Sequence, residues 1–186
     1  MNFSIKFLFG LLLLSFMVGL FFPQWLPLTG LVSAPSSSVS FSGIQSAFCP
    51  SLSCESIPIQ FLNNAHSRVW IAMYSFTNQN LADAVMAAHK RGLDVRVIVE
   101  KQQAGSQFSL HDELAEKGIP VRIDTNPNLM HHKFAVVDND GVITGSMNWT
   151  GNGVSGNNEN VLVIHSNELN SQFEKEFVSL WEKFSP

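Results

Sequence analysis

Hydrophobic and polar positions along the chain follow two periods, which predict strands and helices in turn. A short apolar run at 69–74 is bounded by polar residues, as in a buried strand. Residues 80–91 carry apolar positions on a helical period, with Asn78 or Asn80 as the N-terminal cap and Gly92 as the stop. The pattern continues with strands at 95–99 and 120–123 and, between them, a helix at 109–117.

This alternation predicts one α/β domain built on a mixed β-sheet with helices on both faces. The segment 168–184 places large apolar side chains on one helical stripe, which predicts a helix that docks on the domain. No internal repeat is found at any period. The chain therefore supplies a single copy of any site that it forms.

The N-terminal residues have the pattern of an export signal. Lys6 precedes an uncharged apolar run at 7–22, which Pro23 ends, and small residues at 32–34 offer a cleavage site. Residues 1–34 are therefore predicted to be a signal peptide or, if uncleaved, a membrane anchor. Either interpretation places the rest of the chain outside the cytoplasm, as a secreted, periplasmic or membrane-tethered protein.

A Ser-rich linker is predicted at 35–43, so the predicted domain covers 44–186. Cys49 and Cys54 lie near its start, and in an oxidising compartment they could close a small disulfide ring. A zinc site would need two further ligands at suitable spacing, which the sequence lacks. A free, partly buried Cys54 is the alternative that stays open.

Composition restricts the class of ligand. Hydrophobic residues make up 45% of the chain and charged residues 14%, which favours a packed domain. The net charge is -4, so no broad cationic surface is available for nucleic acid or for an anionic membrane. A polyanionic substrate would have to be held by a local positive site.

The residues that suggest chemistry lie around a predicted hairpin. Asp140-Gly141 is a typical two-residue turn between apolar runs, and with this turn Lys133 would face Asn148. Because side chains alternate along a strand, His132 would point to the opposite face. Four side chains would then share one face: His131, Lys133, Ser146 and Asn148.

These residue types suit a phosphodiester substrate. Lys133 and the neutral groups of Ser146 and Asn148 could hold the non-bridging oxygens and stabilise the charge of a five-coordinate phosphorus. One imidazole could attack the phosphorus while a second, protonated imidazole donates to the leaving alkoxide. Glu159 could accept a hydrogen bond from a ring nitrogen of His131 and fix its tautomer.

Asp138 is the remaining candidate of this segment. It lies five residues beyond Lys133, so strand parity turns it away from the active face. We interpret it as a strand-end residue that caps or pairs with a group behind the site. A direct catalytic role for Asp138 is the less favoured alternative.

The pattern His131-x-Lys133-x4-Asp138, followed by Gly-Ser-x-Asn at 145–148, resembles the full signature of the phospholipase D superfamily. The segments at 74–77 and 158–160 also resemble the small single-motif bacterial endonucleases of that superfamily. The resemblance implies a mixed sheet flanked by helices, a covalent phosphohistidine intermediate, and no metal or other cofactor. It implies that His131 is nucleophile or acid, that Lys133 and Asn148 bind phosphate, and that Glu159 orients the histidine.

The mechanism requires two imidazoles in different protonation states, but the sequence holds one signature. A homodimer would supply the second imidazole by placing His131 of both chains across a two-fold axis. The same arrangement is implied by the resemblance. Since the predicted active face offers no cluster of carboxylates, we also expect activity without a divalent metal.

Three hypotheses for the substrate follow. The main one is an extracytoplasmic endonuclease acting on DNA or RNA, with Lys101, Arg122 and Arg68 available for backbone contacts. The alternative is a phospholipase D that hydrolyses phospholipid head groups, although the N-terminal segment is the one apolar stretch suited to acyl chains. The third, a silent phosphate-binding module, is disfavoured because the set of catalytic residue types is intact.

Overall fold

The computed structural model describes residues 43–184 of the 186-residue chain. The predicted signal or anchor segment at 1–34 and the linker residues 35–42 lie outside the described residues. Between residues 43 and 184, no helix combines the length and the apolar character needed to cross a membrane.

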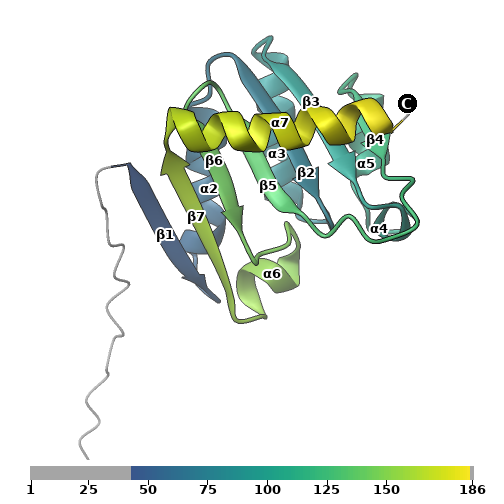
Figure 1. The fold of residues 1–186 in the computed structure, drawn as a ribbon. Helices are drawn as coiled ribbons and strands as arrows, with labels where there is room; N and C mark the ends of the chain where they lie inside the picture. The colour runs from purple at the N-terminus through teal and green to yellow at the C-terminus, as the bar shows by residue number, and fades with distance from the viewer. Residues whose placement is uncertain (1–42, 185–186) are drawn as a thin grey trace, which may run out of the picture. The chain divides into compact units, whose positions relative to one another are not determined.

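A seven-stranded mixed sheet forms the centre of the domain (Figure 1). The strands are β1 (Ile44–Cys49), β2 (Arg68–Met73), β3 (Asp94–Val99), β4 (Val121–Ile123), β5 (Lys133–Val137), β6 (Gly141–Gly145) and β7 (Glu159–His165). Their order across the sheet is β1-β7-β6-β5-β2-β3-β4. Strands β2, β3 and β4 are parallel, whereas β1, β7, β6, β5 and β2 pair with antiparallel neighbours.

Helices cover both faces of this sheet, which confirms the predicted fold class. The helices are α2 (Ser53–Asn63), α3 (Gln79–Lys90), α4 (Lys101–Ala104), α5 (His111–Glu116), α6 (Gly151–Ser155) and α7 (Asn167–Lys183). Figure 1 shows α2 and α3 behind the sheet and α7 crossing its front.

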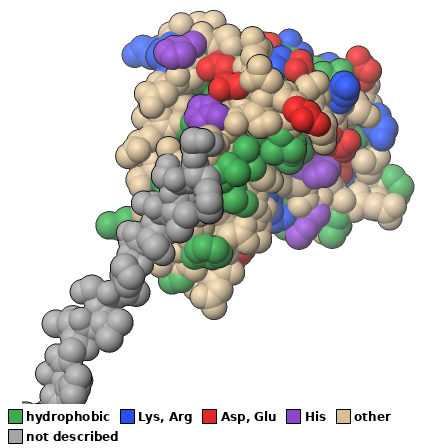
Figure 2. All heavy atoms as spheres, turned by 60° about the vertical axis from the view of Figure 1, so that its left-hand side comes forward, with side chains coloured by type: hydrophobic (Ala, Val, Ile, Leu, Met, Phe, Trp, Pro, Cys, Tyr) green, Lys and Arg blue, Asp and Glu red, His purple; other side chains and the backbone are tan. Residues whose placement is uncertain are grey.

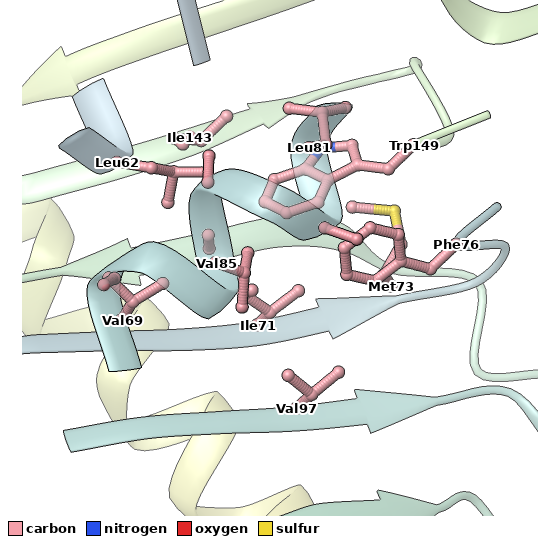
Figure 3. Packing of buried hydrophobic residues seen from close by; sticks show 14 of the residues in the cluster. Leu62, Val69, Ile71, Met73, Phe76, Leu81, Val85, Val97, Ile143 and Trp149 are labelled. Carbon is pink, nitrogen blue, oxygen red and sulfur yellow. The ribbon is translucent and has the colours of Figure 1, made fainter. Parts of the chain in front are cut away.

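The larger core lies between the sheet and helices α2 and α3 (Figure 3). Ile71 of β2, Leu81 of α3 and Leu62 of α2 are fully buried there, and burial of each such side chain stabilises the fold by about 1.5–3 kcal/mol. Helix α3 begins where the side chain of Asn78 accepts a hydrogen bond from the backbone N–H of Leu81. It ends at Gly92, whose φ of +87° is the left-handed conformation that glycine adopts readily.

A second, smaller core lies under α7. Phe177, Leu180 and Phe184 pack on the opposite sheet face, where the rings of Phe177 and Trp70 stack with centroids 5.3 Å apart. Ser166 caps the helix by accepting a hydrogen bond from the N–H of Leu169. The apolar stripe at 168–184 is therefore a docking helix, as the sequence predicts.

Strands β2 to β4 and helices α3, α5 and α7 lie within a few residues of their predicted positions. Strands β1 and β7 and helix α2 were not predicted from the sequence. The short helix α6 lies in a stretch rich in glycine and asparagine.

The predicted register of the β5–β6 hairpin was wrong. Val137 pairs with Gly141, so three residues form the turn and Asp138 takes the left-handed conformation with φ +51°. Gly141 is a strand residue, and a Cβ placed on it would lie 2.5 Å from the ring of Phe61. Ala135 consequently faces Ile143 instead of Ser146.

Cys49 and Cys54 form a disulfide, which is one of the two alternatives that the sequence left open. The bond joins the end of β1 to the first turn of α2. Cys49 pairs with Glu159 across β1 and β7, so the disulfide braces the strand that carries a candidate site residue.

We expect reduction of this disulfide to lower the free energy of unfolding by about 2 kcal/mol, because a short covalent loop restricts the unfolded chain. Urea unfolding with and without dithiothreitol measures the change. A Cys49→Ser/Cys54→Ser variant is the control and should be insensitive to dithiothreitol. Equal stability of the oxidised and reduced wild type would contradict the prediction.

Candidate active site

The predicted site residues lie at one end of the central strands, which we call the sheet edge. Strand β5 begins at Lys133, β6 ends at Gly145 and β7 begins at Glu159. Because these neighbouring strands are antiparallel, the three positions meet at the same edge. The end of β2 joins them there, since Met73 pairs with Lys133.

Gly145 allows β6 and β7 to approach closely at this edge. It has a φ of +145°, and a Cβ on it would lie 2.3 Å from the carbonyl oxygen of Asn160. That carbonyl accepts hydrogen bonds from the backbone N–H groups of Ser146 and Met147. The glycine of the Gly-Ser-x-Asn pattern is thus required by backbone contact.

Glu159 is held by two polar neighbours. The Ser146 hydroxyl donates a short hydrogen bond to Oε2, and Nδ2 of Asn157 donates to Oε1 at 3.1 Å. Ser146 Oγ in turn accepts from the backbone N–H of Asn160. Within this chain, Ser146 and Asn157 therefore orient the Glu159 carboxylate. The role expected for Glu159 beside a histidine ring stays a prediction.

His131 and Lys133 share an aromatic neighbour, Tyr74, whose role sequence reasoning missed. The rings of Tyr74 and His131 meet edge to face with centroids 4.6 Å apart. The ammonium of Lys133 lies 5.1 Å from the Tyr74 centroid and donates to the carbonyl of His131 at 2.8 Å. Tyr74 directly follows β2, a buried strand that ends beside the site. An aromatic residue at that position is the sequence signal that could have identified Tyr74 as a site residue.

Two opposing effects act on the pKa of Lys133. Partial burial lowers the pKa of Lys133 below its ordinary value, and the nearby carboxylate of Glu159 opposes this by favouring the charged form. The site thus holds a cation that is only partly solvated and is available to an anionic ligand.

Asn148 has an unsatisfied side chain in the described part of the chain. Its Oδ1 is buried without a hydrogen-bond partner, which costs about 1–3 kcal/mol. Its backbone is fixed by the following helix, because a Cβ on Gly153 would lie 2.3 Å from the Asn148 carbonyl oxygen. Oδ1 is an acceptor, so a donor group of a ligand could satisfy it, whereas a phosphoryl oxygen could be bound only through Nδ2.

His132 points to the other side of the sheet, as predicted. Its ring lies 5.3 Å from that of Phe134, and Nε2 is 3.2 Å from a carboxylate oxygen of Glu176 on α7. An open groove lies between this edge and α7. Its lining includes His131, His132, Lys133 and Thr144 together with Phe173 and Glu176 of α7, so His132 and its partner Glu176 border the same groove as His131.

Asp138 lies at the opposite end of β5, roughly 16 Å from Lys133 at about 3.3 Å per residue. Its carboxylate accepts hydrogen bonds from the backbone N–H groups of His66, Ser67 and Arg68 and from the Ser67 hydroxyl. Burial raises the pKa of Asp138, but these hydrogen bonds outweigh it and hold the pKa below the ordinary value. The catalytic alternative for Asp138 is therefore corrected: the residue ties the β5–β6 turn to the start of β2.

Metal ligands do not gather at the site. Within residues 43–184, no group of three or more His, Cys, Asp or Glu side chains is placed to hold an ion. The expectation of metal-independent activity stays a prediction.

Comparison with known proteins identifies the class to which this fold and edge site belong. A family model described as "Cardiolipin synthase, PLD-like domain" matches residues 59–181. The chain therefore belongs to the phospholipase D superfamily.

Curated relatives share the name mitochondrial cardiolipin hydrolase. The mouse protein is 38% identical over 171 residues, covering 90% of this chain and 76% of the relative. The human protein is 40% identical over 125 residues, covering 66% of this chain and 48% of the relative. The Chlamydomonas reinhardtii protein is 37% identical over 126 residues, covering 68% of this chain and 56% of the relative. The chain thus spans about half the length of the human and algal relatives.

Two solved structures share the fold. Nuc from Salmonella typhimurium, described as a phospholipase D family member, is 30% identical with a TM-score of 0.73, covering 76% of this chain and 95% of Nuc. NucT from Helicobacter pylori is 22% identical with a TM-score of 0.70, covering 76% of this chain and 96% of NucT.

We expect Asp138→Ala to destabilise the domain by about 1–3 kcal/mol, since it leaves three backbone N–H groups unpaired. The folded pKa is depressed, so the contribution of the carboxylate is present above the unfolded pKa of about 4. It is lost as the pH falls through the folded value. Urea unfolding at pH 7 and at steps down to pH 2 should show the difference shrinking in acid. A large fall in turnover at unchanged stability would restore the catalytic alternative.

Activity at high pH should depend on the charge of Glu159. Removing that charge in Glu159→Gln leaves the burial of Lys133 unopposed, so Lys133 should lose its proton at a lower pH. The alkaline limb of kcat/KM for a soluble phosphodiester should therefore move to lower pH. Ser146→Ala is the matched control, because it removes a hydrogen bond to Glu159 but keeps the charge. If the alkaline limb of Glu159→Gln stays at the wild-type pH, the ionisation that limits activity at high pH is not that of Lys133.

Proposed function

We propose that this chain is a metal-independent phosphodiesterase that forms a covalent phosphohistidine on His131. The observation that carries the proposal is the pairing of His131 with the Lys133 ammonium around Tyr74 at an open sheet edge. Asn148 precedes Trp149, whose backbone bonds to the segment after β2, and its Nδ2 is the group proposed to bind phosphate. A nucleophile, a fixed cation and an amide donor are groups that phosphoryl transfer uses.

The proposed reaction has two displacements. A ring nitrogen of His131 attacks the phosphorus, the bond to the leaving oxygen breaks, and a protonated imidazole gives that oxygen its proton. The same imidazole, now neutral, takes a proton from water as the water oxygen attacks the phosphohistidine and releases the phosphomonoester. Lys133 and Asn148 hold the non-bridging oxygens through both steps.

The second imidazole is proposed to come from another copy of the chain. His132 turns to Glu176 on α7, and His165 is the last residue of β7, at the strand end away from the site, with its ring on Asp140. A C2 homodimer with His131 of each copy at one composite site would supply the missing proton donor.

A phospholipid is the proposed substrate class. The curated relatives are named for cardiolipin hydrolysis, and two apolar side chains project beside the site. Leu52, three residues after the end of β1, is 90% exposed, and Leu129, two residues before His131, is 52% exposed. Such side chains can enter the apolar boundary of a bilayer while the groove meets the head group. These two side chains add exposed apolar surface outside the N-terminal segment.

The main hypothesis from the sequence was a nucleic acid substrate. Fewer cationic side chains than expected are free to contact its phosphate backbone. The guanidinium of Arg68 is paired with Glu174 at 2.7 Å, at the sheet end away from the site. Arg122 donates a short hydrogen bond to the carbonyl of Trp181. Lys101 is exposed, although it donates to the carbonyl of Asn126 at 2.7 Å. Nucleic acid consequently becomes the second arm of the test.

The site of action is proposed to be an oxidising compartment outside the cytoplasm. The Cys49–Cys54 disulfide supports this, because disulfides persist outside reducing compartments. The predicted export signal at 1–34 points the same way.

The test offers the full-length protein vesicles of cardiolipin or phosphatidylcholine, single-stranded DNA, duplex DNA and RNA, each in excess EDTA after dialysis. We expect phospholipid hydrolysis at rates within a few-fold of the untreated protein. Loss of activity in EDTA that added zinc, magnesium or calcium restores would refute the histidine mechanism. Cleavage of nucleic acid without phospholipid would replace the proposed substrate.

His131→Ala is the matched variant in the same assay. Since it removes the nucleophile, turnover should fall by more than the roughly 10²–10⁴-fold that acid–base assistance contributes. Its melting temperature should stay near that of the wild type, because His131 is exposed. A variant that retains more than about a tenth of wild-type turnover would remove His131 from the proposed mechanism.

A further inference from the structure

The ring of His131 is held by one aromatic neighbour. His131 is exposed, and Figure 2 shows histidine side chains that reach the surface beside Lys or Arg side chains. Its backbone carbonyl accepts a hydrogen bond from Lys133, but within residues 43–184 no group forms a hydrogen bond with its ring nitrogens. The ring instead meets that of Tyr74 edge to face, with centroids 4.6 Å apart. The orientation of the imidazole in this chain therefore depends on Tyr74.

Tyr74 is fixed at both ends. Its backbone N–H donates to the carbonyl of His132 at 2.8 Å, which holds the start of the side chain beside β5. Its hydroxyl accepts a hydrogen bond from Nε2 of Gln103 at 3.2 Å. The backbone contact alone would leave the ring free to change rotamer. The contact with Gln103 favours the one orientation in which the ring meets His131.

Gln103 is in turn held by a buried carboxylate. Glu100 is fully buried, and its Oε2 accepts hydrogen bonds from the backbone N–H groups of Gln102 at 2.7 Å and Gln103 at 3.1 Å. These bonds cap the start of α4. Ala104, the last residue of α4, packs into the larger core. The backbone of Gln103 is thus fixed on both sides, and its side chain reaches Tyr74 from a rigid position.

We infer that Gln103 is a positioning residue for His131 and that it acts through the hydroxyl of Tyr74. The inference rests on the proposed function, in which a ring nitrogen of His131 attacks the phosphorus. Such an attack requires the imidazole to be aimed accurately, since a displacement of about 1 Å can cost on the order of 10²-fold in rate.

Lys133 should depend on Gln103 less than His131 does. The ammonium of Lys133 lies 5.1 Å from the centroid of the Tyr74 ring, but it also donates to the carbonyl of His131 at 2.8 Å. It therefore keeps a hydrogen bond when the ring of Tyr74 moves. Loss of the Gln103 contact should slow the attack by His131 more than it weakens the binding of phosphate.

A different role for Tyr74 would be to donate its hydroxyl to the substrate. The two roles separate in a double-variant cycle. If Gln103 acts through the Tyr74 hydroxyl, Gln103→Leu and Tyr74→Phe remove the same contact, so the double variant should be no slower than either single variant. If the hydroxyl contacts the substrate, Tyr74→Phe should be the slower of the two single variants.

The experiment compares Gln103→Leu with Gln102→Leu in the full-length chain, kept in a nonionic detergent. Gln102 is the matched control because it is exposed on the same helix and its side chain forms no hydrogen bond in the described part of the chain. Hydrolysis of bis(p-nitrophenyl) phosphate gives kcat/KM, which reports the attack, and inhibition by inorganic phosphate reports binding. Circular dichroism checks the fold, and Tyr74→Phe carries the test if Gln103→Leu does not fold.

Two spectroscopic signals follow the contact without turnover. Tyr74 is the one tyrosine of the 186-residue chain, so tyrosine labelled with ¹³C at Cζ gives a single signal that reports its hydroxyl. Histidine labelled with ¹⁵N gives a ring signal for His131, which is identified by its loss in His131→Ala.

We expect Gln103→Leu to lower kcat/KM about tenfold, by displacing the imidazole, and to leave the phosphate inhibition constant within about twofold of wild type. The Cζ signal of Tyr74 and the ring signal of His131 should both move. Tyr74→Phe and the double variant should show the same loss of kcat/KM, and Gln102→Leu should match the wild type.

An active wild type with equal kcat/KM in Gln103→Leu and Gln102→Leu would overturn the positioning role and leave the proposed function standing. A His131 signal that stays in place in Gln103→Leu, or a Tyr74→Phe variant much slower than Gln103→Leu, would also overturn it. If the wild type cleaves no phosphodiester while the His131 signal moves in Gln103→Leu alone, the positioning of the ring stands and the proposed function fails.

Discussion

The register of the antiparallel strands β2, β5, β6 and β7 is the constraint on which the site depends. A slip of one residue would turn Lys133 to the face that α7 covers and turn Phe134, which packs under α7, to the opposite face. Contacts at both ends of these strands fix the register. At one end, Asp138 joins the β5–β6 turn to the first residues of β2. At the other, Gly145 brings β6 against the backbone of Asn160. Each contact tolerates few substitutions. Asp138 must supply a carboxylate from a left-handed backbone conformation, and Gly145 must lack a Cβ.

The sequence was sufficient to predict those elements whose signals lie within the element itself. Helix α3 has a cap, a stop and a clear period, and its bounds were predicted within a residue or two. The hairpin register was not predictable in this way, since Asp140-Gly141 has the composition of a two-residue turn. Gly141 is instead required by the ring of Phe61, which is distant in sequence. The partner of Glu159 was missed for a similar reason: the position of Ser146 depends on the pairing of β6 with β7.

An acidic chain can hold an anionic substrate here because the positive charge is local and only partly hydrated. Tyr74 supports the ammonium of Lys133 with its ring face, and burial removes part of the competing water. Glu159 keeps that charge from being lost, yet its own oxygens are occupied by Ser146 and Asn157. The carboxylate therefore favours the charged form of Lys133 while its oxygens bond to other groups. In the proposed mechanism, Lys133 takes the part that a bound metal ion plays in metal-dependent phosphodiesterases.

The placement of α7 determines which histidine of the signature is available at the groove. Helix α7 packs over β6, β5 and β2, and its Phe173 and Glu176 line the groove beside His131. Nε2 of His132 lies 3.2 Å from the Glu176 carboxylate, which ties that imidazole to the helix. The ring of His131 instead rests against Tyr74, at the end of the strands that also holds Lys133. The proposed reaction needs one imidazole to attack and another to donate a proton, so a mechanism built on His131 depends on a histidine from a second copy.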